Sequence, residues 1–510
     1  MTITVMRQLE KMALLGAIFF LPISNLPKRF APSFISHNLA EVFAVVGLVL
    51  LVVEYFQFGF PIPKKAKYFI LIFTGWQFLC LGIGFISYPY HDLIMVENSR
   101  FFQTFAIISA SGLSISKYFI ENLWLFYRSA KIILLDANMV FYVAFLVYHL
   151  YHDNYQEAFY DFRKAVLAIV IVMGMYSLIE LCWIKTNNEV AKDLLKIINP
   201  FFYDPKIAHG WWPPLLWEGQ LRSITCEPSF FGIVGVFCLP FLWSYLFEKK
   251  HIMSILIFYF SLMIFATNAR TAIVIALAEL LLLAGSSLLA KKKDYTKYVA
   301  VILGISVFAF LGNLVNVNSL FHGFNKNTSM SVGEYYETNI HSLSKKDSRS
   351  NSARFANLEA NINAIKEHPV TGVGTGLTDG YIDAHIPESA YSNNEVRNWS
   401  RYLHMLGIPK ASFPKLNKYA FEGIKNGIPG LGLYLLPFFY LAAKILKYKE
   451  RYLKDPCLIS LEIALAGQLA CWMSNVEFSL IKGILLGILF CVPGRCFQVE
   501  KRKRNNEILL

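Results

Sequence analysis

The sequence predicts an all-α, polytopic transmembrane protein with about twelve spans and a large extracytoplasmic loop. Of the 510 residues, 55% are apolar and only 16% are charged, and the mean hydropathy is +0.44. Soluble domains carry roughly a quarter charged residues. The apolar residues here come in runs of about 17 to 22, the helix length that crosses a hydrocarbon core of roughly 30 Å. A soluble enzyme fold is therefore excluded for most of the chain.

Hydropathy defines the candidate spans in order along the chain. They cover residues 10–26, 39–59, 67–87, 100–118, 131–151, 163–184, 229–247, 251–267, 269–290, 297–316, 421–446, 457–475 and 477–494. The first of these runs has no small-residue cleavage site, so we expect a retained span and no removed signal peptide.

Short basic clusters between the spans predict which loops face the cytoplasm. These clusters are Lys64 and Lys65, Lys249 and Lys250, Lys291 to Lys293, residues 444–454 and the tail at 495–504. With both termini inside, one candidate before residue 185 must fail to cross. The weakest is 131–151, which contains Asp136 and Asn138. Either this segment is re-entrant or interfacial and twelve spans remain, or it crosses and another candidate is wrong.

This topology divides the chain into three regions. Residues 1–316 are expected to be transmembrane helices with an outer loop at 185–228, residues 317–420 an extracytoplasmic loop region, and residues 421–510 C-terminal helices with a basic cytoplasmic tail. Long loops without secondary structure are uncommon unless they are functional. No internal repeat is visible in the sequence, which argues against a transporter.

Charge and cysteine usage exclude several other classes. The 48 Lys and Arg residues exceed the 35 Asp and Glu residues, but the excess lies in short clusters between spans, so nucleic acid is not an expected partner. The eight cysteines form no CxxC pair, and the histidines of the outer loops lack metal-ligand spacing. We therefore expect no metal and no other cofactor.

Three arginines fall on the predicted outer face, against the usual charge bias: Arg222, Arg270 and Arg354. Arg270 opens a span, where an unpaired guanidinium is costly, so it should have an anionic partner; the alternative is an arginine that snorkels to the headgroups. Arg354 is expected in the first turn of a helix capped by Asn351 or Ser352. A helix N-terminus with an arginine suits phosphate, although a solvated surface arginine would look the same.

Apolar residues on this predicted helix mark the face that should pack against the protein. They are Phe355, Leu358, Ile362 and Ile365.

Glu227 precedes Pro228 at the outer edge of a span, and we expect it beside Arg222. It is either a catalytic base or an ion-pair partner that pins the loop. The glycine-rich run 372–376 follows a helix and a proline and not a strand, so it is interpreted as a turn and not as a phosphate loop.

Several segments together resemble the O-antigen ligase and polymerase family. They are Glu227-Pro-Ser-Phe-Phe-Gly232, Asn268-Ala-Arg270, Ser352-Ala-Arg-Phe355, Ile365 to Gly376, Asn417-Lys-Tyr419 and Gly427-Ile-Pro-Gly-Leu431. They cover roughly residues 220 to 440 in the order typical of the family, which is more specific than any one of them.

The resemblance implies a glycosyltransferase of the GT-C type in the bacterial cytoplasmic (inner) membrane. Its substrate would be an oligosaccharide linked to undecaprenyl pyrophosphate, and a chain-length regulator and a flippase would be further partners beside the lipid bilayer. Arg222 and Arg270 match arginines thought to hold the pyrophosphate, and Arg354 matches a third recurrent arginine. Asn417 and Tyr419 would contact sugar, as would the aromatic loop residues Trp211, Trp212 and Trp217, for which anchoring at the membrane interface is the alternative.

One position departs from the family pattern. Its ligases usually carry histidine immediately before the Asn of the Asn-x-Tyr segment, where this chain has Leu416. This favours a repeat-unit polymerase over a ligase that transfers glycan to lipid A core. Glu227 is then the first candidate for the catalytic base, and His404 is the second.

A polysaccharide flippase or transporter is the alternative from another class. Such a protein would carry ionisable residues inside its spans, and we expect only a few here: Glu41, Asp136, Glu180, Glu279 and Glu462.

Overall fold

The computed structural model describes residues 2–24, 26–27, 30, 38–99, 101–103, 116–152, 154–202, 219–291, 293–314 and 349–493. Every regular element among them is helical, which confirms the predicted all-α class. The loop tryptophans Trp211, Trp212 and Trp217, and the basic tail, lie outside the described residues, as does most of the span predicted at 100–118.

The α-helices before residue 203 form the N-terminal part of the bundle. They are α1 (Ile3–Phe19), α2 (Leu39–Phe58), α3 (Lys64–Ile86), α5 (Lys117–Lys131), α6 (Met139–Tyr151), α7 (Tyr155–Thr186) and α8 (Glu189–Ile198). A π-helical turn, Ile132–Ala137, joins α5 to α6, so the segment suspected of being re-entrant is the second half of a 35-residue helical stretch, Lys117–Tyr151.

The second half of the chain adds two groups of helices. The first is α9 (Pro228–Phe247), α10 (Met253–Ala266), α11 (Arg270–Ala290) and α12 (Lys293–Leu314). The second is α15 (Arg349–Glu367), α16 (Thr378–Ala384), α17 (Asn394–Leu406), α18 (Lys418–Lys447), α19 (Lys449–Lys454), α20 (Pro456–Cys471) and α21 (Ser479–Phe490). The described part of the region predicted as a loop at 317–420 therefore contains three helices.

Eight helices in the described residues are long and apolar enough to cross a membrane. They are Leu39–Phe58, Lys64–Ile86, Lys117–Tyr151, Tyr155–Thr186, Pro228–Phe247, Arg270–Ala290, Asp294–Leu314 and Lys418–Lys447. Shorter apolar helices are Met253–Ala266, Pro456–Cys471 and Ser479–Phe490. The chain is thus a multi-pass membrane protein, and the count of twelve spans stays a prediction.

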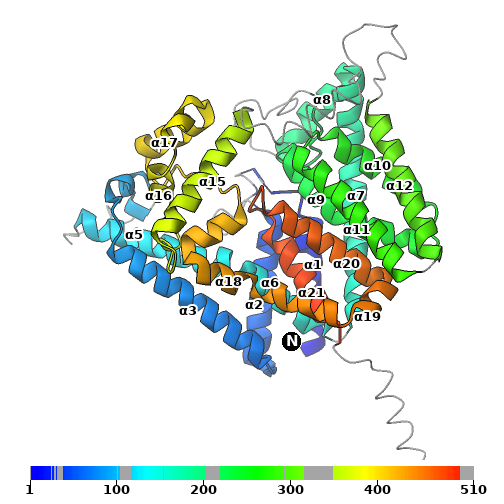
Figure 1. Ribbon diagram of the computed structural model, residues 1–510, viewed down its shortest axis with the longest axis horizontal. Coiled ribbons are helices and arrows are strands. Elements are labelled where there is room, and N and C mark those ends of the chain that lie inside the picture. Colours follow the sequence, from blue (N-terminus) through cyan, green and yellow to red (C-terminus); the bar gives the residue numbers. More distant parts are fainter. Residues whose placement is uncertain are drawn as a thin grey trace, which may run out of the picture.

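Two large apolar cores and one small cluster around Phe265, Ile273 and Ala309 lie in the part of the chain that the structure describes. The larger core joins α1, α2, α6, α7, α9, α10, α20 and α21, and the smaller core joins the end of α3 and α5 to α15, α16 and α17. Figure 1 shows α15, α16 and α17 gathered on the side of α3 and α5, and α7 to α12 gathered on the opposite side. The helices of the predicted outer region therefore pack as a second body of structure against the spans.

The glycine-rich run is confirmed as a turn, and it packs against a kink in α18. Gly427 has φ +68°, and a Cβ there would lie 2.0 Å from the carbonyl oxygen of Val370, so the kink requires glycine. The kink leaves the carbonyls of Ile424 and Lys425 free to accept hydrogen bonds from the N–H groups of Val373 (2.8 Å) and Gly374 (3.0 Å). This joint fixes the turn after α15 to the membrane helix α18.

Candidate active site

Glu227 stands at the start of the most buried membrane helix. It is the N-cap residue of α9 with extended backbone (φ −140°, ψ 151°), and Pro228 follows at the first helical position, where its missing N–H costs nothing. Its Oε2 accepts a hydrogen bond from Ser229 Oγ at 3.0 Å. In the apolar stretch of this helix, 89% of the residues are buried. The helix start that carries the Glu227 carboxylate is therefore held rigidly.

Close packing of α9 and α11 brings Arg270 to the same end of the bundle. Arg270 is the first residue of α11, as the sequence predicted for a span-opening arginine. A Cβ on Gly232 would lie 2.3 Å from the Cβ of Ala272, so only glycine lets the two helix starts approach this closely. The last residue of the Glu-Pro-Ser-Phe-Phe-Gly segment therefore positions the Asn-Ala-Arg segment.

Arg354 reaches this place from α15. Its Nη1 donates a hydrogen bond to the carbonyl oxygen of Ser474 at 3.0 Å, in the turn between α20 and α21. Partial desolvation lowers the pKa of Arg354, the negative charge of Glu227 raises it, and the positive charge of Arg270 lowers it. These interactions bring together Glu227, Arg270 and Arg354, which we call the Glu227 cluster.

Two details of the Arg354 helix differ from the prediction. The helix begins at Arg349, before the expected caps Asn351 and Ser352, so Arg354 lies in the second turn and not at the N-terminus. The buried face is a stripe of alanines (Ala353, Ala356, Ala360 and Ala364), whereas Phe355 and Ile362 are more than 40% exposed. Small side chains allow the backbone of α15 to lie close to its neighbours, which the apolar pattern alone did not indicate.

The electrostatics of Glu227 suit a proton acceptor. Burial raises the pKa of Glu227, the hydrogen bond from Ser229 and the charge of Arg354 lower it, and the charge of Glu477 raises it. The net shift is upward from the usual value of 4.5. An ionised carboxylate with a raised pKa is a stronger proton acceptor, and an adjacent arginine holds it in place.

Arg222 forms its described ion pair with a carboxylate on α7. The charge of Arg354 acts on Glu227, and the expected position of Arg222 beside Glu227 stays a prediction. Arg222 is fully buried, and its Nε lies 4.0 Å from Oε1 of Glu180 on α7. Oε2 of the same carboxylate accepts the backbone N–H groups of Arg222 (3.2 Å) and Ser223 (2.6 Å). Glu180 therefore fixes the segment that leads into Glu227.

His404, the second candidate base, has its described partner outside the Glu227 cluster. His404 on α17 pairs with Asp383 on α16, with 2.7 Å between Nε2 and Oδ2. It lies nine residues from Glu395, the α17 residue whose charge acts on Arg354, which is about 14 Å along the helix. The described contacts therefore do not bring His404 to Glu227.

Asn417 and Tyr419 both bind the end of α20. Asn417 caps α18 by accepting the N–H of Ala420, and its Nδ2 donates to the carbonyl of Met473 at 3.1 Å. The hydroxyl of Tyr419 donates to the carbonyl of Leu469 at 2.9 Å. Both side chains thus hold α18 against the α20–α21 turn that Arg354 also contacts.

A cavity of about 200 Å³ has both apolar and charged residues in its walls. Its walls include Lys415, Lys418 and Lys425 of the α18 region, Asp136 of the π-helical turn, and Glu477. Since the charge of Glu477 also acts on Glu227, this wall residue links the cavity to the cluster. The walls combine cationic and carboxylate groups, which suits a ligand rich in hydroxyl groups.

The sequence analysis missed several ionisable residues inside apolar helices. Glu422 is fully buried, and its Oε1 lies 2.8 Å from Nζ of Lys418 and 2.7 Å from Nζ of Lys425. Their spacing of three and four residues on one helix was a readable signal. Glu54 and Lys482 are likewise buried within apolar helices. The expected number of ionisable residues inside the spans was therefore too low.

Residues 255–408 match the family model described as O-antigen ligase. This part of the chain is an O-antigen ligase family domain. The matched residues include Arg270 and Arg354, while Glu227 lies ahead of the match and Asn417 after it. No curated protein matches the chain.

Proposed function

We propose that this protein is a membrane glycosyltransferase that polymerises undecaprenyl-pyrophosphate-linked oligosaccharide repeat units into O-antigen, capsule or exopolysaccharide. The reaction would take place on the outer face of the cytoplasmic membrane. The observation that carries the proposal is the convergence of Glu227, Arg270 and Arg354 from three helices.

Each member of the Glu227 cluster has a place in the reaction. The bond between the anomeric carbon of the donor glycan and the pyrophosphate oxygen breaks, and Arg270 and Arg354 stabilise the charge that develops on that oxygen. The acceptor hydroxyl attacks the anomeric carbon, and its proton passes to Glu227. Arg222 anchors the segment that leads into Glu227. Its positive charge also attracts the pyrophosphate.

The acceptor sugar needs a polar site within reach of Glu227. The cavity lined by Lys415, Lys418, Lys425 and Asp136 offers donors and acceptors for sugar hydroxyls. Glu477 lines this cavity and its charge also acts on Glu227. This supports an acceptor that enters from the cavity while the donor pyrophosphate lies against Arg270 and Arg354.

A ligase that transfers glycan to lipid A core is the second candidate, and the matched family description favours it. The chemistry is the same, and only the acceptor differs. Leu416 at the position where the ligases usually have histidine favours the polymerase.

Glycan chain lengths in a deletion strain separate these functions. A polymerase is supported if surface glycans shrink to single repeat units on the core and a plasmid copy restores long chains. A bare core with long chains accumulating on the lipid carrier would indicate a ligase. A bare core with only single lipid-linked units would indicate a flippase.

A further inference from the structure

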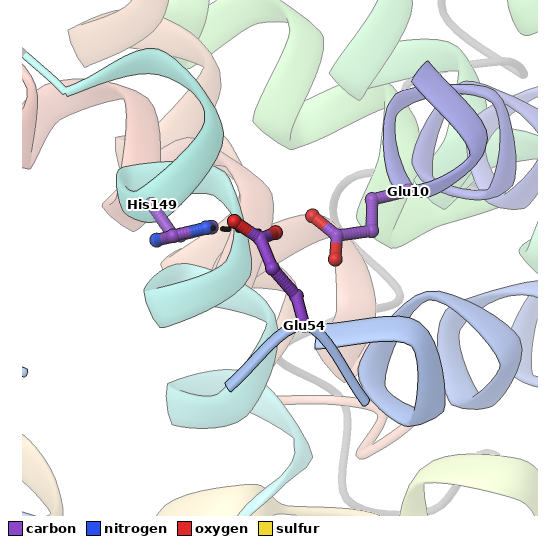
Figure 2. Close-up of side chains that lie close together, drawn as sticks. All are labelled: Glu10, Glu54 and His149. Atoms are coloured by element: carbon purple, nitrogen blue, oxygen red, sulfur yellow. Dashed lines mark hydrogen bonds and ion pairs between the residues drawn. The ribbon is translucent and has the colours of Figure 1, made fainter. Parts of the chain in front are cut away.

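A second group of buried ionisable residues lies away from the Glu227 cluster, where α1, α2 and α6 meet. It consists of Glu10 on α1, Glu54 on α2 and His149 on α6. One ligand atom from each lies within 4.8 Å of the other two. Figure 2 shows the two carboxylates facing each other, with the imidazole on the far side of Glu54.

The described ion pairs at this place go to Glu54 and not to Glu10, although the charge of Arg7 also acts on Glu10. Nε of Arg7 lies 3.1 Å from Oε1 of Glu54, and Nε2 of His149 lies 3.2 Å from Oε2. Glu10 is fully buried, and neither of its oxygens accepts a hydrogen bond from any residue that the structure describes. Two facing carboxylates inside apolar helices repel each other strongly unless one of them is protonated or a further cation lies between them.

A bound metal ion supplies that cation and uses the third ligand. A proton shared by Glu10 and Glu54 would need only two oxygens. The nitrogen of His149 from a third helix completes the mixed nitrogen and oxygen set that divalent transition metals prefer. Arg7 would then act as the outer partner that orients the Glu54 carboxylate.

We infer that Glu10, Glu54 and His149 form a binding site for a divalent transition-metal ion, with Zn²⁺ as the probe. The ion joins the consecutive helices α1 and α2 to α6, which lies about eighty residues further along the chain. The site is structural, it lies outside the Glu227 cluster, and it stabilises the N-terminal helices whether or not the proposed transferase activity is correct.

The test is metal content of the purified, tag-free full chain in detergent. Bound metal is first removed from the protein with EDTA, and the protein is then dialysed against Zn²⁺. After gel filtration has removed the excess metal, the bound zinc is measured by elemental mass spectrometry. We expect one zinc ion per chain for the wild type and none for Glu10→Gln or His149→Gln. Zn²⁺ should also raise the melting temperature of the wild type and leave that of Glu10→Gln unchanged.

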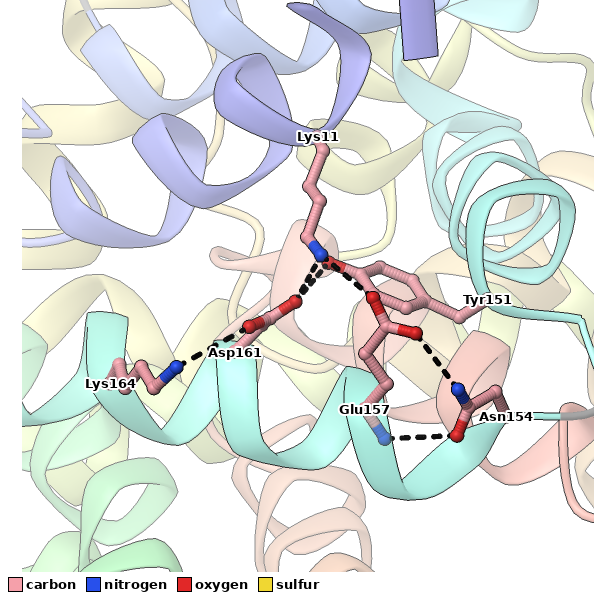
Figure 3. A network of polar contacts seen from close by, with 6 residues as sticks. All are labelled: Lys11, Tyr151, Asn154, Glu157, Asp161 and Lys164. Atoms are coloured by element: carbon pink, nitrogen blue, oxygen red, sulfur yellow. Dashed lines mark hydrogen bonds and ion pairs between the residues drawn. The ribbon is translucent and has the colours of Figure 1, made fainter. Parts of the chain in front are cut away.

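Glu157→Gln is the matched control. Glu157 also interacts with α1, through Lys11 at 3.0 Å, but its side chain is 52% exposed and belongs to the separate network of Lys11, Tyr151 and Asp161 shown in Figure 3. This variant should bind zinc like the wild type. Equal zinc in the wild type and Glu10→Gln, or none in the wild type, would overturn the inference. Because Glu10→Gln keeps the shape of the side chain and removes one carboxylate, it should fold.

Discussion

At the scale of single residues, the proposed mechanism assigns the proton transfer to Glu227. Replacing it by glutamine keeps the shape but removes the proton acceptor. We expect Glu227→Gln to lower turnover by about 100-fold or more, in the range of general-base loss, while binding of the lipid-linked donor persists. Normal turnover of this variant would show that the reaction uses another base or none.

The pH dependence gives the same residue a second test. Glu227 accepts a proton only when ionised, and burial raises its pKa above the usual value. Activity should therefore fall as the pH drops through that raised pKa. Arg354 lowers the pKa of Glu227, so in Arg354→Gln the acidic limb of the rate profile should move to higher pH. A limb that stays in place would mean that Arg354 and Glu227 are not coupled.

The arginines differ in what they contribute. Arg270→Ala should abolish polymer while the protein stays folded in the membrane, and Arg270→Lys should rescue poorly, because an ammonium cannot bind phosphate bidentately. Arg222→Ala should also abolish polymer but lower the melting temperature as well, since it leaves buried Glu180 without its arginine. Glycan length and thermal unfolding, measured side by side, check both. Full activity of Arg270→Ala would show that Arg270 does not bind the pyrophosphate.

At the scale of elements, the approach of α9 to α11 is what places Arg270. Gly232→Ala would force a methyl group to within 2.3 Å of the Cβ of Ala272. We expect this overpacking to cost about 1–3 kcal/mol and to reduce polymer by displacing the start of α11. Gly285→Ala on α11 is the control, since nothing lies within 4 Å of the added Cβ. Wild-type melting and polymer in Gly232→Ala would contradict this role.

The sequence predicted some of these elements because their signals are local. Pro228 after Glu227 marks a helix start, and Arg270 after a polar break marks another, and both are confirmed. The pairing of Glu227 with Arg354 could not be read from the sequence, because it joins segments more than a hundred residues apart. The buried alanine face of α15 was also missed, since alanine gives a weaker apolar signal than the exposed Phe355 and Ile362.

Buried charges were missed for a related physical reason. In a hydropathy average, Glu422 and Lys425 are outweighed by their apolar neighbours, although the two side chains neutralise each other within one helix. Glu54 and Glu10 come from different helices, so only the folded chain brings them together. Pairing in three dimensions decides whether a charge is tolerated in a span.

At the scale of the whole molecule, the mechanism requires the Glu227 cluster to face the outside. Reporter tags after residues 65, 250, 293 and 505 should give cytoplasmic signals, and tags near 205 and 345 should give external signals, because the basic clusters stay inside. The helices α15 to α17 follow the 345 tag directly. A cytoplasmic signal from that tag would place the arginines on the wrong side for the proposed substrate.

Purified protein and a lipid-linked repeat unit are sufficient to test whether this chain transfers glycan. The wild type, Glu227→Gln and Arg270→Ala would each be incubated in detergent with a lipid-linked repeat unit, with no nucleotide sugar added, and the products separated by length. We predict a ladder of lengthening glycans and released undecaprenyl pyrophosphate with the wild type, and only the starting unit with either variant. A wild type that makes no ladder, or variants that make the same ladder, would contradict the claim that these residues transfer glycan from a lipid pyrophosphate.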